Sequence, residues 1–131
     1  MIPRLAPAAG RAAAAALLIL LASCDNPFRS DGIYVRLENT SSYELHDVSF
    51  RSGDRPVTAD VLGPSGRSGY QDVPRTGGEG AVQATIGDQH LAITPVDAVV
   101  FQKPLRPGHY TYRVAVDLPS HWIGGEMVRD R

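Results

Sequence analysis

The sequence is poor in cysteine and has no excess of charge of either sign. Cys24 is the only cysteine among 131 residues, which excludes a fold held by disulfide bonds, even in an oxidising compartment. The 13 basic and 14 acidic residues leave a formal net charge of −1. We therefore expect no nucleic acid as a partner, because phosphate binding needs a dense cationic face. The apolar run at residues 12–21 is too short for a membrane-spanning helix, which needs about 20 residues.

The N-terminal segment has the order of a secretion signal. Arg4 and Arg11 precede or begin the apolar run, residues 1–24 contain no acid, and small residues follow the run. Residues 21–24, Leu-Ala-Ser-Cys, resemble the lipobox of bacterial lipoproteins, in which the cysteine is lipidated and becomes the new N-terminus. The resemblance implies a signal peptide at residues 1–23 and lipidation of Cys24.

Two other interpretations of this segment stay open. They are an ordinary signal peptide with an incidental cysteine, and an uncleaved membrane anchor. Lipidation is favoured because a single unpaired thiol in an exported chain needs an explanation. Two or three acyl chains would hold the protein stably on the membrane, whereas one holds only marginally. We expect a location in the bacterial cell envelope, facing the periplasm or the cell surface. Asp25 resembles the signal that keeps enterobacterial lipoproteins in the inner membrane.

After Cys24 the sequence predicts short strands. Glycine and proline interrupt the chain at short intervals, and no stretch shows a 3.6-residue apolar period. Alternation predicts strands at residues 33–38, 43–51, 57–62, 68–73 and 110–117, and a short strand at residues 97–101. The apolar parity changes within the second of these strands. One extra residue near His46 and Asp47, a β-bulge, would let both halves face the core.

The clearest local pattern is a hairpin at residues 81–94. Gly87 and Asp88 form a two-residue turn of the glycine-first kind. The turn predicts the facing pairs Val82 and Ile93, Ala84 and Leu91, and Thr85 and His90. The apolar residues then share one face, and a slip by one residue would expose them to water.

About seven short strands in a domain of roughly 100 residues predict an all-β fold. We expect a small antiparallel β-sandwich, immunoglobulin-like or transthyretin-like, with a small barrel as the alternative. The expected parts are a linker that starts with the lipidated cysteine at residues 24–32, the sandwich at residues 33–118, and a flexible tail at residues 119–131. Docking of Trp122 on the sheet stays open.

Three stretches resemble a group of uncharacterised small bacterial lipoproteins. They are Val-Arg-Leu-Glu-Asn at residues 35–39, Thr-Ile-Gly-Asp-Gln at residues 85–89, and Lys-Pro-Leu-Arg-Pro-Gly-His-Tyr-Thr-Tyr at residues 103–112. These stretches consist of turns and core positions. The resemblance therefore implies the same β-rich fold and adds no activity and no site.

The sequence contains no recognisable set of catalytic or metal-binding residues. Cys24 is consumed if it is lipidated, and the glycine-rich residues 77–80 lack the lysine and the following helix of a phosphate loop. The four histidines lack the short spacing of ligands from one element; they are His46, His90, His109 and His121. We expect no catalytic residue, no cofactor and no metal. The predicted function is a non-catalytic interaction or structural module, held at the membrane by Cys24, with an envelope protein or a glycan as partner.

The alternative is a small-ligand or metal-binding module, or a minor enzyme, with its site in the loops at one end of the sandwich. Residues 74–80, Asp97 and His109 would contribute to that site. Asp97 is also suited to capping a turn. Tyr34 and Tyr70 would stand on an exposed face.

Overall fold

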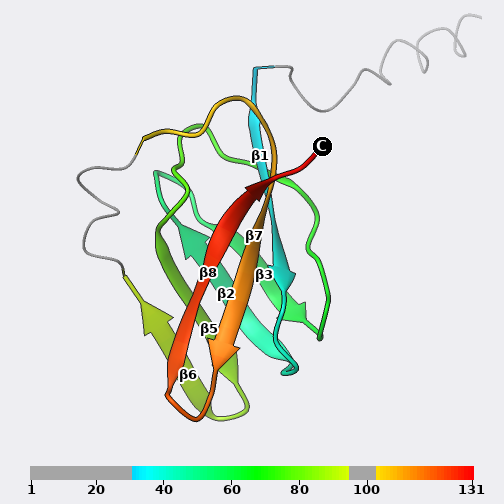
Figure 1. Cartoon of the computed structure of the whole chain (residues 1–131), viewed down its shortest axis with the longest axis vertical. Coiled ribbons are helices and arrows are strands. Elements are labelled where there is room, and N and C mark those ends of the chain that lie inside the picture. The colour runs from blue at the N-terminus through cyan, green and yellow to red at the C-terminus, as the bar shows by residue number, and fades with distance from the viewer. Residues whose placement is uncertain (1–30, 95–102) are drawn as a thin grey trace, which may run out of the picture.

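The computed structural model of the chain describes residues 31–94 and 103–131. Within these ranges, eight β-strands form two four-stranded sheets that pack face to face (Figure 1). The expected all-β sandwich is confirmed. The N-terminal residues 1–30 and the strand expected at residues 97–101 lie outside the described residues. In the part of the chain that the structure describes, no helix is long and apolar enough to cross a membrane.

The first sheet, sheet A, contains the first and the last two strands. Its strands are β1 (Ile33–Asn39), β4 (Gln71–Asp72), β7 (Gly108–Asp117) and β8 (Trp122–Arg129). They lie in the order β4-β1-β7-β8. The neighbours β1 and β7 are parallel, and the other two pairs are antiparallel. The parallel pair is an exception to the antiparallel pairing expected from the sequence.

The second sheet, sheet B, is antiparallel throughout. Its strands are β2 (Leu45–Arg51), β3 (Val57–Leu62), β5 (Ala81–Ile86) and β6 (Gln89–Ile93), in the order β3-β2-β5-β6. The hairpin of β5 and β6 has the three facing pairs that the turn predicts, and Gly87 has a φ of +60°. The bulge is confirmed as well. The register of β2 against β5 shifts between His46 and Ser49, and Asp47 has a φ of +50°.

Strand β8 corrects the expectation of a flexible tail at residues 119–131. All of β8 pairs with β7, and Ile123 is buried. The alternation was hidden because two glycines stand in the middle of the strand. Gly125 is an inward position where a Cβ would lie 2.4 Å from the carbonyl oxygen of Arg113 and 2.8 Å from the ring of Tyr112. Close packing therefore demands the residue type that makes the strand hard to recognise.

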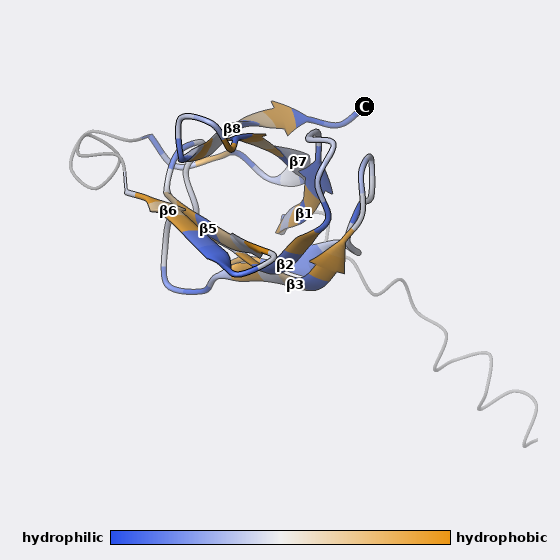
Figure 2. Ribbon diagram, turned by 90° about the horizontal axis from the view of Figure 1, so that it is seen from below, coloured by the Kyte–Doolittle hydropathy of each residue, from blue (hydrophilic) through white to orange (hydrophobic). Residues whose placement is uncertain are grey.

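The core lies between the two sheets, which Figure 2 shows as separate layers seen from below. Phe50 of sheet B stacks on Tyr112 of sheet A with 4.0 Å between ring centroids. Burial raises the pKa of Tyr112 to about 12. Aliphatic side chains fill the rest of the core, chiefly Val35, Leu37, Leu45, Val48, Val57, Val82, Leu91, Val114 and Ile123.

A buried amide joins the end of β1 to two other segments. Asn39 is 0% exposed, and its Nδ2 donates hydrogen bonds to the carbonyl oxygens of Tyr43 (2.6 Å) and Leu62 (3.0 Å). Its Oδ1 accepts from the main-chain N–H (2.9 Å) and the hydroxyl (2.6 Å) of Ser41. The side chain of Asn39 thus replaces the water that these main-chain groups would otherwise need. The next residue, Thr40, is held by two hydrogen bonds of its own, from its main-chain N–H and its Oγ1 to the carbonyl of Val114.

Candidate functional site

The outer face of sheet A carries polar and aromatic side chains along its length. Side chains alternate along a strand, so the residues that flank the inward core positions point away from it. Two groups occupy opposite ends of this face. The tyrosine–histidine cluster lies where β1 begins and consists of Tyr34, Arg36, Tyr70, His109, Thr111 and Asp130. The tryptophan groove lies where β1 ends and is lined by Thr40, Arg113, Ala115, Trp122, Gly125 and Glu126.

The rings of the tyrosine–histidine cluster pack on one another. His109 stacks on Tyr34 with 5.0 Å between centroids and meets Tyr70 edge-on at 4.8 Å. The guanidinium of Arg36 lies 4.8 Å from the centroid of Tyr70. Tyr34 is only 3% exposed, which corrects the expectation that it stands on an exposed face. Residues 67–72 run antiparallel along β1 and bring Tyr70 to this position.

The polar atoms of the tyrosine–histidine cluster converge on Asp130. Its carboxylate accepts hydrogen bonds from Tyr70 Oη (2.6 Å) and Thr111 Oγ1 (2.8 Å). Arg36 Nε donates to the same threonine oxygen (2.9 Å) and lies 3.8 Å from the carboxylate. Burial, followed by the bond to Asp130, raises the pKa of Tyr70. This arrangement fastens the end of β8 to β1 and β7.

A row of alternating charges leads from the cluster to the groove. Glu38 accepts hydrogen bonds from Arg67 and, at 3.1 Å, from Arg113 Nε. Arg113 Nη1 also lies 3.4 Å from Glu126 Oε1. The hydrogen bond from Arg67 holds the pKa of Glu38 below its usual value, and Arg113 acts in the same direction. Two guanidinium groups therefore face two carboxylates, and the charges of the row balance.

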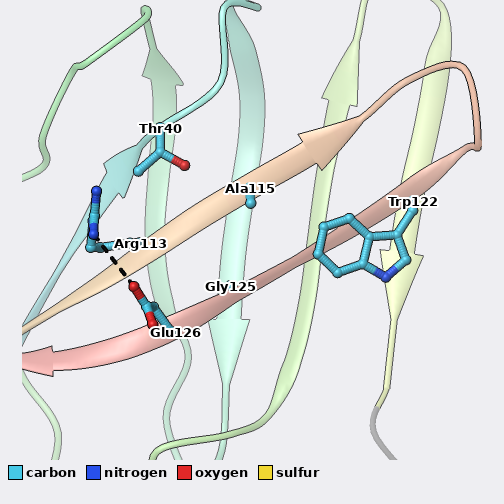
Figure 3. Close-up of a pocket in the computed structure, with 6 residues that line it drawn as sticks. All are labelled: Thr40, Arg113, Ala115, Trp122, Gly125 and Glu126. Atoms are coloured by element: carbon cyan, nitrogen blue, oxygen red, sulfur yellow. Dashed lines mark hydrogen bonds and ion pairs between the residues drawn. The ribbon is translucent and has the colours of Figure 1, made fainter.

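The tryptophan groove is an open depression of about 330 Å³. Figure 3 shows Trp122 at one end, the ion pair of Arg113 and Glu126 at the other, and Ala115 and Gly125 between them. Trp122 is 44% exposed. Its ring lies over Gly124, where an added Cβ would come within 2.4 Å of Cζ2. The absence of a side chain at Gly124 thus lets the indole lie against the strand.

The structure describes two of the three parts of the predicted end-loop site, namely residues 74–80 and His109. His109 belongs to the outer face of sheet A, whereas residues 74–80 close one end of the sandwich. In this loop the carbonyl of Thr76 accepts from the N–H of Leu105 (2.8 Å), and the N–H of Gly77 donates to Ser52 Oγ (3.0 Å). Asp97 and Cys24 lie outside the described residues. Residues 31–94 and 103–131 contain no group of three or more His, Cys, Asp or Glu that could hold a metal ion.

The other histidines lie apart from this face. His46 and His90 flank Thr85 on sheet B, and His121 lies in the turn before β8 with a φ of +54°. The groove was not predicted from the sequence, in which only docking of Trp122 on the sheet was left open. The signal was present in β8, where Trp122, Gly124 and Glu126 alternate with inward positions.

No family model and no curated protein matches this chain. Among solved structures, the chain is similar to one described as the NMR structure of the protein from Eubacterium rectale. The two share 11% sequence identity, the match covers 77% of this chain and 90% of that chain, and the TM-score is 0.49.

Proposed function

We propose that this protein is a lipid-anchored module of the bacterial cell envelope that faces an extracytoplasmic space and binds another envelope component without catalysing a reaction. The observation that carries the proposal is the sequence Leu-Ala-Ser-Cys at residues 21–24, at the end of an apolar run that follows two arginines. Acyl chains on Cys24 would keep the protein on the membrane. Asp25 favours the inner membrane.

The arrangement of sheet A supports a binding role for a tethered domain. Residues 25–31 would span at most about 25 Å when extended, so the domain would stay near the bilayer. The chain enters the sandwich at Ile33, beside the tyrosine–histidine cluster, and β1 runs about 20 Å from there to the tryptophan groove (Figure 1). The groove would then lie at the end of the domain away from the anchor.

The lipid anchor is tested by mass spectrometry of the protein purified from bacterial membranes. We expect the wild-type chain to begin at Cys24 and to carry acyl groups. The Cys24→Ser variant should keep residues 1–23 and lack these groups. Ser23→Ala, which keeps a small residue before the cysteine, should behave like the wild type. An unmodified Cys24 with residues 1–23 still attached would contradict the proposal.

One observation favours the alternative of a small-ligand site in the end loops. A second groove, of about 340 Å³, lies beside residues 74–80 and is lined in part by Arg51, Glu79 and Thr94. A thermal-shift screen of metal ions and small metabolites tests it. A rise of several degrees with one compound, abolished by Arg51→Ala, would support this alternative, and a flat screen would remove it.

A further inference from the structure

We propose that the tryptophan groove binds an uncharged glycan. The inference rests on the proposed function, because it names the class of envelope component that the tethered module would bind. Its first support is the exposed indole of Trp122. A flat aromatic surface beside polar groups is suited to a ligand with both apolar and polar faces, and a pyranose ring has C–H groups on its faces and hydroxyls at its rim.

The polar atoms at the other end of the groove suit hydroxyl groups. Arg113 uses Nε and Nη1 for its two carboxylate partners, and Nη2 has no partner among the contacts of the described residues. Glu126 engages one carboxylate oxygen and has an exposed side chain. Thr40 Oγ1 donates to the carbonyl of Val114 (2.7 Å) and keeps its acceptor capacity. The groove therefore offers both donors and acceptors, as hydroxyls require.

The charge of the groove argues for a neutral ligand. Arg113 lies between Glu38 and Glu126, so its positive charge is already compensated. An anionic ligand would meet the exposed Glu126, and a cationic ligand would compete with Arg113 for the same carboxylates. The groove would therefore recognise its ligand through hydrogen bonds and not through a net charge.

The dimensions of the groove fit a chain of sugars better than a protein surface. Trp122 and Glu126 are four positions apart on β8, which places their Cα atoms about 13 Å apart. This distance is longer than one pyranose ring. Between these two residues, Ala115 and Gly125 line the groove without a large side chain, and Gly124 lies under the indole. Trp122 is the one large apolar side chain of the lining, whereas protein interfaces usually centre on a cluster of buried apolar anchors.

The test uses the fluorescence of Trp122, which is the only tryptophan of the chain. The full chain, purified in a detergent without a sugar headgroup, is titrated with three probes: maltohexaose and chitohexaose, which are neutral, and polygalacturonate, which is anionic. We expect at least one neutral oligosaccharide to shift the emission of Trp122 and to protect it from quenching by acrylamide. Polygalacturonate should have no effect.

Three variants, measured by calorimetry, locate the binding. Trp122→Ala should weaken binding at least about tenfold, because aromatic anchors dominate such contacts. Gly124→Ala keeps the indole but displaces it, and should weaken binding as well. Val128→Ala is the matched control, since Val128 is 39% exposed on the same face of β8, outside the groove lining. It should bind like the wild type.

The outcomes separate glycan binding from other occupants and from the anchor. Unchanged affinity of Trp122→Ala would overturn the inference, as would binding of polygalacturonate alone. It would also be overturned if both oligosaccharides and the neutral glycan fraction of the producing bacterium failed to bind, including the case in which an envelope protein occupied the groove instead. Binding by the Cys24→Ser variant is measured in parallel. If that variant binds while the wild type proves unlipidated, the groove assignment stands and the tethered location fails.

Discussion

At the end of sheet A where β1 begins, aromatic and charged side chains bind one another, whereas at the end where β1 finishes, similar side chains face solvent. Tyr34 is 3% exposed and Trp122 is 44% exposed, although both project from the same face of the same sheet. The difference comes from their neighbours. Residues 67–72 run along the start of β1 and bring Tyr70 to the cluster, but Ala115 and Gly124 flank Trp122.

This comparison shows why one part of an outer sheet face is packed while another part stays open. An aromatic ring beside other large side chains packs against them, so its surface is covered. The polar groups around it are then already bonded to one another. The same kind of ring beside glycine and alanine keeps a free face. Small residues next to Trp122 are therefore as important for the groove as the indole itself.

Removing the buried amide of Asn39 should have the largest effect on stability. Asn39→Ala leaves the buried carbonyl of Leu62 and the partly buried carbonyl of Tyr43 without their donor, so we expect a loss of about 3–4 kcal/mol in the free energy of unfolding. Urea denaturation of the full chain measures it. Ser42→Ala, in the same turn but exposed, is the control. A loss below about 0.5 kcal/mol for Asn39→Ala would show that the turns do not depend on the amide.

Truncating one aromatic residue at each end sharpens the comparison. Tyr34→Ala should cost about 3 kcal/mol, because it removes a buried ring that stacks on His109. Trp122→Ala should cost less than about 1 kcal/mol, because the indole is half exposed. The two variants are compared by urea denaturation under one set of conditions. Equal losses would mean that Trp122 is a structural residue and would remove the contrast between the ends.

Replacing Asp130, the acid at the centre of the tyrosine–histidine cluster, should reduce stability by a smaller amount. Asp130→Ala leaves Tyr70 and Thr111 without their shared acceptor and Arg36 without its ion-pair partner, and we expect a loss of about 2 kcal/mol. Asp117→Ala, at the groove end of β7, should change stability little, because Asp117 is exposed. Thermal unfolding of both variants checks this. A stronger effect at Asp117 would contradict the stabilising role of the tyrosine–histidine cluster.

Replacing Glu38, in the row of charges between the two ends, should produce the smallest change in stability. This change should depend on pH. The pKa of Glu38 is lowered in the folded state, so its contribution to stability is present above its usual pKa near 4.5 and is lost as the pH falls through the folded value. The stability difference between wild type and Glu38→Gln should therefore stay constant above about pH 4.5 and shrink as the pH falls below that value. Glu44→Gln, an exposed control on the other side of the domain, serves for comparison. A constant difference for Glu38→Gln would rule out this role of the two arginines.

Local chemistry explains which parts of the fold could be predicted. The hairpin at residues 81–94 follows from Gly87 and a period-two pattern beside it, and the bulge follows from a parity change within one strand. Strand β8 was not predicted from the sequence because Gly124 and Gly125 interrupt its alternation of apolar and polar residues. Packing against Tyr112 and space for Trp122 require these glycines, and both requirements arise from tertiary contacts.

The candidate site was harder to predict for the same reason. Thr40, Arg113 and Trp122 meet through pairing of β1, β7 and β8, which lie far apart in sequence. The burial of Tyr34 likewise depends on residues from another part of the chain. A single residue pattern cannot report such convergence. Cys24 could be singled out because its signal is contiguous, and its lipidation stays a prediction.

The parallel pairing of β1 with β7 also determines when the domain can be completed. The first strand finds its long partner only near the other end of the polypeptide, and β8 adds to that partner in turn. Contacts of such high sequence separation form late, since the ends of a long loop must first be brought together. A nascent chain, in which β1 is made first, therefore cannot close this sheet until β7 and β8 have followed.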